Sequence, residues 1–100
     1  MMVFESDSEL GELFRVLKSH LGVSVTCRSG GTNDYILAAR THDGQSMLPW
    51  YGNQSCAECA NRMVKTFQRN GIPLADGKRA FLPEFDSMNE LKMKLDLMGK

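Results

Sequence analysis

The sequence predicts a small α+β domain with the element order helix, three strands, helix, short strand, helix. Apolar residues recur at helical spacing near the N-terminus and again after residue 55, and they alternate with polar residues between positions 23 and 51. Short stretches rich in glycine, asparagine and aspartate separate these patterns. We therefore expect an antiparallel sheet of three to four strands, with the helices packed on one of its faces.

Size and composition limit what the chain can be. One hundred residues, 42% of them hydrophobic, suffice for one core, so residues 1–100 are predicted to form a single compact domain. Twelve basic residues balance twelve acidic ones, which gives no chain-wide argument for nucleic acid or an anionic membrane as partner. The sequence shows neither a secretion signal nor a membrane span, so we expect a cytoplasmic protein. Three cysteines in such a chain predict reduced thiols.

The first helix is predicted to begin after Ser6, which has the spacing of a capping box with Glu9, and to end at Gly22. Three strands follow, and we place them at residues 23–28, 35–41 and 45–51 from their alternating pattern.

The third strand carries its own positional signal. The turn His42-Asp43-Gly44 predicts a hairpin between the second and third strands. Pro49 cannot donate a ladder hydrogen bond, so the third strand should lie at the edge of the sheet.

Two further helices are predicted by capping signals. Ser55 and Glu58 mark the start of the second helix, which carries a regular apolar stripe and ends at Asn70-Gly71. A short strand is expected within residues 79–85.

The helical periodicity of the last helix is weaker than that of the second, because the apolar residues within 91–97 also alternate as they would in a strand. Ser87 and Glu90 form a third capping box in the sequence. The pairs Glu90 with Lys94 and Lys92 with Asp96 have i,i+4 spacing, which favours a helix.

The stretch Cys56-Ala57-Glu58-Cys59 at a helix start raises the question of thiol chemistry. Together with the preceding Trp50 it resembles, locally, the motif of glutaredoxin-like proteins, which implies a redox-active thiolate favoured by the helix dipole. The element order differs from that family, and no proline stands in the expected place. The spacing also suits two zinc ligands, although a closed site needs four. We interpret Cys56, and Cys27 on the buried face of the first strand, as core residues.

A partner-binding surface is predicted from the exposed charges and aromatic residues. Basic residues gather on the outer face of the second helix and just after it, Trp50 and Tyr51 lie near the sheet edge, and Met93 lies on the last helix. The candidate partner-binding residues are Arg62, Lys65, Arg69, Lys78, Arg79, Trp50, Tyr51 and Met93.

The order of the first five elements resembles that of double-stranded-RNA-binding domains. That resemblance implies an RNA partner, but the lysines which such domains carry at the start of the second helix are replaced here by Asn53-Gln54-Ser55-Cys56. We keep nucleic-acid binding through the basic face as a third hypothesis.

The function predicted first is a small non-enzymatic protein-binding module. No phosphate-binding loop, dinucleotide fingerprint or nucleophile elbow occurs in the sequence. The module would modulate or inhibit a larger protein or complex by steric or electrostatic occlusion, as do the compact inhibitors encoded by phages and mobile elements. No cofactor is expected on this hypothesis. The second hypothesis is a thiol-redox or zinc protein that uses Cys56 and Cys59.

Overall fold

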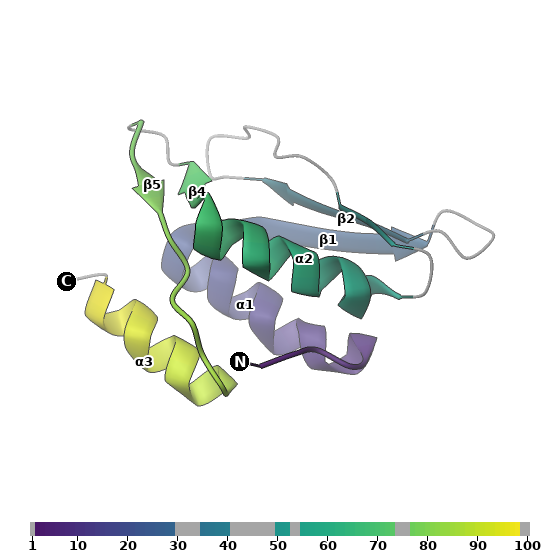
Figure 1. Cartoon of the computed structure of the whole chain (residues 1–100), viewed down its shortest axis with the longest axis horizontal. Coiled ribbons are helices and arrows are strands. Elements are labelled where there is room, and N and C mark those ends of the chain that lie inside the picture. Colours follow the sequence, from purple (N-terminus) through teal and green to yellow (C-terminus); the bar gives the residue numbers. More distant parts are fainter. Residues whose placement is uncertain (1, 30–34, 41–49, 53–54, 74–76, 99–100) are drawn as a thin grey trace.

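A three-stranded antiparallel sheet, backed by two helices, forms the main part of the computed structural model (Figure 1). The structure describes residues 2–29, 35–40, 50–52, 55–73 and 77–98. Its elements are a 3-10 turn η1 (Asp7–Glu9), α1 (Leu10–Leu21), β1 (Ser24–Ser29), β2 (Tyr35–Arg40), β3 (Trp50–Gly52), α2 (Cys56–Arg69), β4 (Ile72–Pro73), β5 (Arg79–Ala80) and α3 (Met88–Met98).

The described strands form two sheets, and not the single sheet of three to four strands that the sequence predicts. In the larger sheet the order is β1-β2-β3, with both pairs antiparallel. The expected fourth strand does not join it, because β5 pairs with β4 in a separate two-stranded sheet. Gly71, with φ +80°, turns the chain directly after α2, so β4 begins at the end of that helix.

The predicted edge position of the third strand agrees with the order of the described strands. Trp50 is the register partner of Leu37, and Tyr51 is the partner of Ile36. The rest of the predicted strand, with Pro49, and the predicted turn His42-Asp43-Gly44 lie outside the described residues.

The core lies between the sheet and the two helices on one of its faces. Helix α1 packs against β1, whereas α2 packs against β2 and β3 (Figure 1). Leu37 and Ala39 of β2 face these helices and are fully buried. Helix α3 packs on α1, so it extends the core away from the sheet. The largest fully buried side chains come from all three layers: Phe67, Phe85, Leu13, Leu17, Leu37, Met63, Ile72 and Leu91.

Two of the three predicted capping boxes supply a cap hydrogen bond. The N–H of Glu58 donates to Ser55 Oγ at 3.2 Å, and the N–H of Glu90 donates to Ser87 Oγ at 3.2 Å. The prediction at Ser6 is wrong, because its side chain makes no cap hydrogen bond and the 3-10 turn η1 precedes α1. Helix α1 ends at Gly22 in the left-handed conformation, as predicted.

Helix α3 is attached to α1 through two of its charged side chains. The predicted pair Glu90–Lys94 is present, at 2.9 Å. The predicted pair of Lys92 with Asp96 is not formed. Lys92 instead contacts Glu12 of α1.

Asp96 makes the second link between these helices. Its Oδ1 lies 2.7 Å from His20 Nε2 at the C-terminal end of α1. Because α3 buries Leu91 and Leu95 against the core, its charged flanks come within reach of the neighbouring helix.

The N-terminal segment is bound to α2 by side-chain hydrogen bonds. Asn61 Oδ1 accepts from the N–H of Phe4 at 2.8 Å, and Asn61 Nδ2 donates to the Phe4 carbonyl at 2.9 Å. Asp7 Oδ1 accepts from the N–H of Ala57 in the first turn of α2, at 2.9 Å. These contacts hold the buried Phe4 ring in the core.

None of the helices among the described residues is both long enough and apolar enough to traverse a lipid bilayer.

Candidate functional site

The predicted basic residues of α2 lie on the side of the helix that faces away from the core. Arg62, Lys65 and Arg69 are exposed, and the buried Phe67 points to the opposite side. They do not contribute equally to the surface charge, because Arg62 forms an ion pair with Glu58 at 3.0 Å. Lys65 and Arg69 make no ion pair with any residue in the described ranges. The positive charge is therefore concentrated in the last two turns of α2.

Strand β5 brings two more cations to this end of α2. Arg79 Nη1 donates to the carbonyl of Asn70, the C-terminal cap residue of α2, at 3.1 Å. A guanidinium in this position also interacts favourably with the negative end of the helix dipole. Lys78 precedes Arg79 and is exposed. All five predicted cations are thus exposed, and β5 lies at the end of α2.

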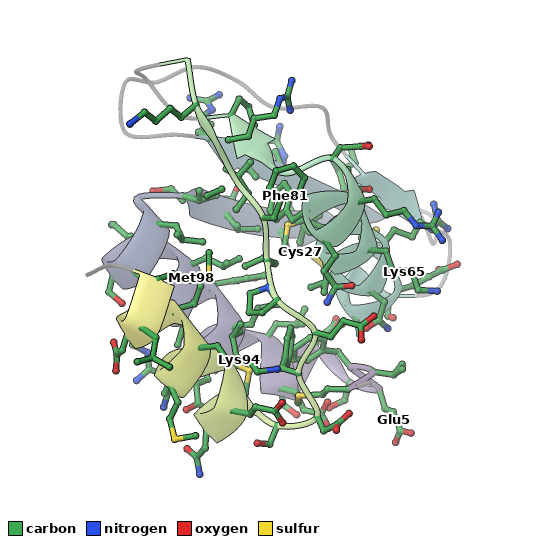
Figure 2. The ribbon with its side chains drawn as sticks, turned by 60° about the vertical axis from the view of Figure 1, so that its left-hand side comes forward. Glu5, Cys27, Lys65, Phe81, Lys94 and Met98 are labelled. Carbon is green, nitrogen blue, oxygen red and sulfur yellow. A yellow bond between two sulfur atoms is a disulfide. The ribbon has the colours of Figure 1, made fainter. Side chains whose placement is uncertain are left out.

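An exposed aromatic ring, which the sequence prediction did not include, lies in the same place. Phe81 is 48% exposed, and it follows β5 directly. A Cβ atom added at Gly71 would lie 3.2 Å from Phe81 Cζ and 3.2 Å from Arg79 Cβ. The ring is therefore seated against the bare backbone of Gly71, beside Arg79. Figure 2 shows Phe81 between helix α2 and the chain that leaves β5.

Two hydrogen bonds attach the segment around Phe81 to α2. The N–H of Leu82 donates to the carbonyl of Phe67 at 3.1 Å, and Gln68 Nε2 donates to the carbonyl of Pro83 at 3.1 Å. Leu82 is buried, so its neighbour Phe81 must point the other way along this extended segment. In the sequence, the signal is the pair Phe81-Leu82: adjacent side chains of an extended segment point to opposite sides, so only one of the two can face the core.

We call the set Lys65, Arg69, Lys78, Arg79 and Phe81 the basic-aromatic surface. It combines an exposed ring, which lies beside Arg79, with the cations near the end of α2. Such a surface can bind a group that carries both negative charge and apolar area.

The remaining predicted contact residues lie elsewhere. Met93 is 64% exposed on the outer side of α3, one turn from Leu97, which is 75% exposed. Figure 2 shows α3, with Met98 labelled, on the other side of the view from Lys65. Trp50 and Tyr51 belong to β3, which pairs with β2 in the three-stranded sheet.

The arrangement of the cysteines differs from the one that the redox and the zinc hypotheses require, in which Cys56 and Cys59 act as a pair. The prediction of three reduced thiols is wrong, because the structure joins Cys27 of β1 to Cys56, the first residue of α2 (Figure 2). Their Cα atoms are 6.2 Å apart, a separation that a disulfide spans. The pairing follows from the fold, since the inward side of β1 faces the start of α2. The prediction that these residues belong to the core is confirmed for Cys56, and Cys27 packs against the core.

Cys59 takes no part in the disulfide and is fully buried. Burial raises the pKa of this thiol, and the nearby Arg62 only partly opposes that effect. A thiol with a raised pKa is a poor nucleophile near neutral pH. Within the described part of the chain, no three His, Cys, Asp or Glu side chains are grouped so that they could hold a metal ion.

The fold and this surface define a small α+β domain with an exposed basic and aromatic contact area. Comparison of the chain with protein-family models, with curated proteins and with solved structures finds no match.

Proposed function

We propose that the chain is a non-enzymatic protein-binding module that modulates or inhibits a larger protein by occlusion. The observation that supports this function best is the exposed positive charge of Lys65 and Arg69 near the end of α2, which no acidic side chain in the described ranges neutralises. The other cation on this face of the helix, Arg62, is instead paired with Glu58. Exposed charges of this kind steer a partner of opposite sign and fix its orientation.

The mechanism in this proposal is steric and electrostatic. A rigid domain of this size, bound through one end of α2, covers a functional surface of its partner without chemistry of its own. In this proposal the protein acts in the manner of the compact inhibitors encoded by phages and mobile elements.

The location of the protein in the cell is also a proposal. A cytoplasmic location is what the sequence predicts, but disulfides persist mainly in oxidising compartments. The Cys27–Cys56 disulfide therefore favours an oxidising compartment over the cytoplasm.

The thiol or zinc hypothesis receives less support from the geometry. It requires Cys56 and Cys59 to act as a pair, whereas Cys56 is bonded to Cys27 and Cys59 is buried.

The test compares two variants that carry the same change of charge. K65E/R69E reverses the end of α2, and R15E/K18E reverses two exposed residues of α1. Each tagged protein is incubated with an extract of the source cells, and the bound proteins are quantified by mass spectrometry. If each exposed charge contributes about 0.7 kcal/mol, the two reversals at α2 weaken partner binding about tenfold.

The expected result is a protein that wild type and R15E/K18E retain and that K65E/R69E loses. Equal recovery by all three proteins would refute a role for this surface. The melting temperature of K65E/R69E should fall by only a few degrees, since no ion pair with a described residue is lost and the reversal of Arg69 in the last turn costs only about 1 kcal/mol of helix-dipole interaction. A large drop in melting temperature would show that the two residues are not simply an exposed face.

A further inference from the structure

We propose that Phe81 is the apolar anchor of the basic-aromatic surface, and that the surface binds an acidic peptide segment carrying an apolar side chain. This inference rests on the proposed function and specifies the chemistry of the partner. It depends on the geometry around Gly71, where an aromatic ring and the side chain of Arg79 lie next to each other.

The ring is held in a fixed position before any partner arrives. One side of it is seated on Gly71, whose positive φ and missing side chain make room for it. The hydrogen bond from Leu82 to Phe67 fixes the backbone next to the ring. A preorganised aromatic residue loses little conformational entropy on binding, which is typical of the residues that contribute most to interfaces.

The cations at this end of α2 select a partner of negative sign. Arg79 lies beside the ring, and its guanidinium is oriented by the carbonyl of Asn70. Arg69 ends the helix one residue before Asn70, and Lys65 lies one turn earlier on the same side. Carboxylates are the groups in proteins that pair with guanidinium and ammonium ions. An apolar side chain that lies between two carboxylates of the partner would cover the exposed part of the Phe81 ring.

A protein partner fits this surface better than a nucleic acid. Single-stranded nucleic acids are bound by several stacking aromatic residues along a basic groove. Among the described side chains, which do not include those of Tyr35, Trp50 and Tyr51, Phe81 is the one exposed large aromatic residue. The chain as a whole has no net charge, whereas nucleic-acid-binding domains are usually basic.

The test uses synthetic ligands, so that the partner need not be known. Three fluorescein-labelled probes are titrated with the protein and followed by anisotropy. The first is a peptide of about twelve residues rich in Asp and Glu with a central Leu-Trp pair. The second has Ser-Ser in place of that pair, and the third is an oligothymidine of similar length.

Wild type should bind the first peptide about tenfold more tightly than the second. F81A should remove this preference, F81L should retain part of it, and M93A/L97A, which removes exposed apolar area from α3, should leave it intact. K65E/R69E should weaken binding of both peptides. Thermal unfolding of each variant checks that the domain is folded.

Three results would overturn the proposal. The variant F81A keeps the wild-type preference for the first peptide, the wild type binds neither peptide, or the wild type binds the oligothymidine more tightly than the first peptide. The first result leaves the proposed function standing if K65E/R69E still loses its partner from the extract. If F81A and K65E/R69E both retain the partner from the extract, both this proposal and the proposed function of the surface are refuted.

Discussion

Removal of the Cys27–Cys56 disulfide should destabilise the domain by several kilocalories per mole. The cross-link joins residues 29 positions apart, and so it closes a loop in the unfolded chain. The loop-closure relation gives a loss of about 12 cal/mol/K for a loop of this length, which is about 3.6 kcal/mol at 25 °C. For a domain of this size, such a loss lowers the melting temperature by roughly 17 °C.

The assay is urea denaturation of the oxidised protein, with and without a reductant that does not absorb in the far ultraviolet. The double variant C27A/C56A should behave like the reduced protein in both conditions. C59A is the matched control, because it removes a buried cysteine that takes no part in the disulfide.

Thiol chemistry tests the pairing itself. The oxidised protein should show almost no thiol reactivity when folded, one reactive thiol when unfolded, and three after reduction. Cleavage after Glu58 separates Cys56 from Cys59, so mass spectrometry can identify a cross-linked peptide that contains Cys27 and Cys56. Superimposable urea curves with and without reductant, or three thiols in the unfolded protein before reduction, would refute the reasoning.

Three other perturbations test the packing around this core. G22A should cost about 1 kcal/mol of unfolding free energy in urea, because φ at the end of α1 is +67° and an alanine there is strained; an unchanged midpoint would contradict this. N61A should cost about 1–3 kcal/mol, because the N–H and carbonyl of Phe4 both lose their partner, and amide hydrogen exchange at Phe4 should accelerate. The contact with Lys92 lowers the pKa of Glu12 below its ordinary value of 4.5, so this carboxylate stabilises the fold above pH 4.5, and the contribution disappears as the pH falls through the lower, folded pKa. Thermal melts of E12Q between pH 2 and pH 7 should therefore show a shallower loss of stability in acid than wild type, and identical pH profiles would exclude the contact.

Local signals in the sequence were sufficient to predict the helices. The capping side chains of Ser55 and Ser87 act within one turn, so their spacing identifies the starts of α2 and α3 directly. The apolar stripe of α2 likewise reports which side of the helix is buried. Ser6 failed as a signal because the first turn at this position is 3-10, and its side chain interacts with Ser8 Oγ at 2.9 Å.

Contacts between distant elements could not be read from the same patterns. Alternation showed that Cys27 faces inward, but periodicity carries no information about which element it meets, so its pairing with Cys56 was missed. The same limit applies to Lys92, for which i,i+4 spacing suggested Asp96 although the helix of Glu12 lies beside it. Where a side chain can reach one partner on its own helix and another on a neighbouring helix, the packing of the helices determines which ion pair forms.

The basic-aromatic surface was predicted in part for a related reason. Its cations stand out in the sequence because charged residues on a marked helix are almost always exposed. Phe81 does not stand out, since an aromatic residue in a short strand is usually buried, and its exposure follows from the burial of Leu82 and the hydrogen bond to Phe67.

The two main features of the domain lie at opposite ends of α2, and this arrangement separates their effects. Cys56 begins the helix and Arg69 ends it, so the disulfide and the basic-aromatic surface are roughly 20 Å apart along the axis. Perturbations at such a distance usually add, so F81A combined with reduction should show the sum of the separate stability changes. Reduction should lower the stability of the domain, while the intrinsic preference of the folded fraction for an acidic, apolar peptide stays the same. A preference that disappeared with the disulfide would instead show that β1 and α2 must be cross-linked to hold the far end of the helix in place.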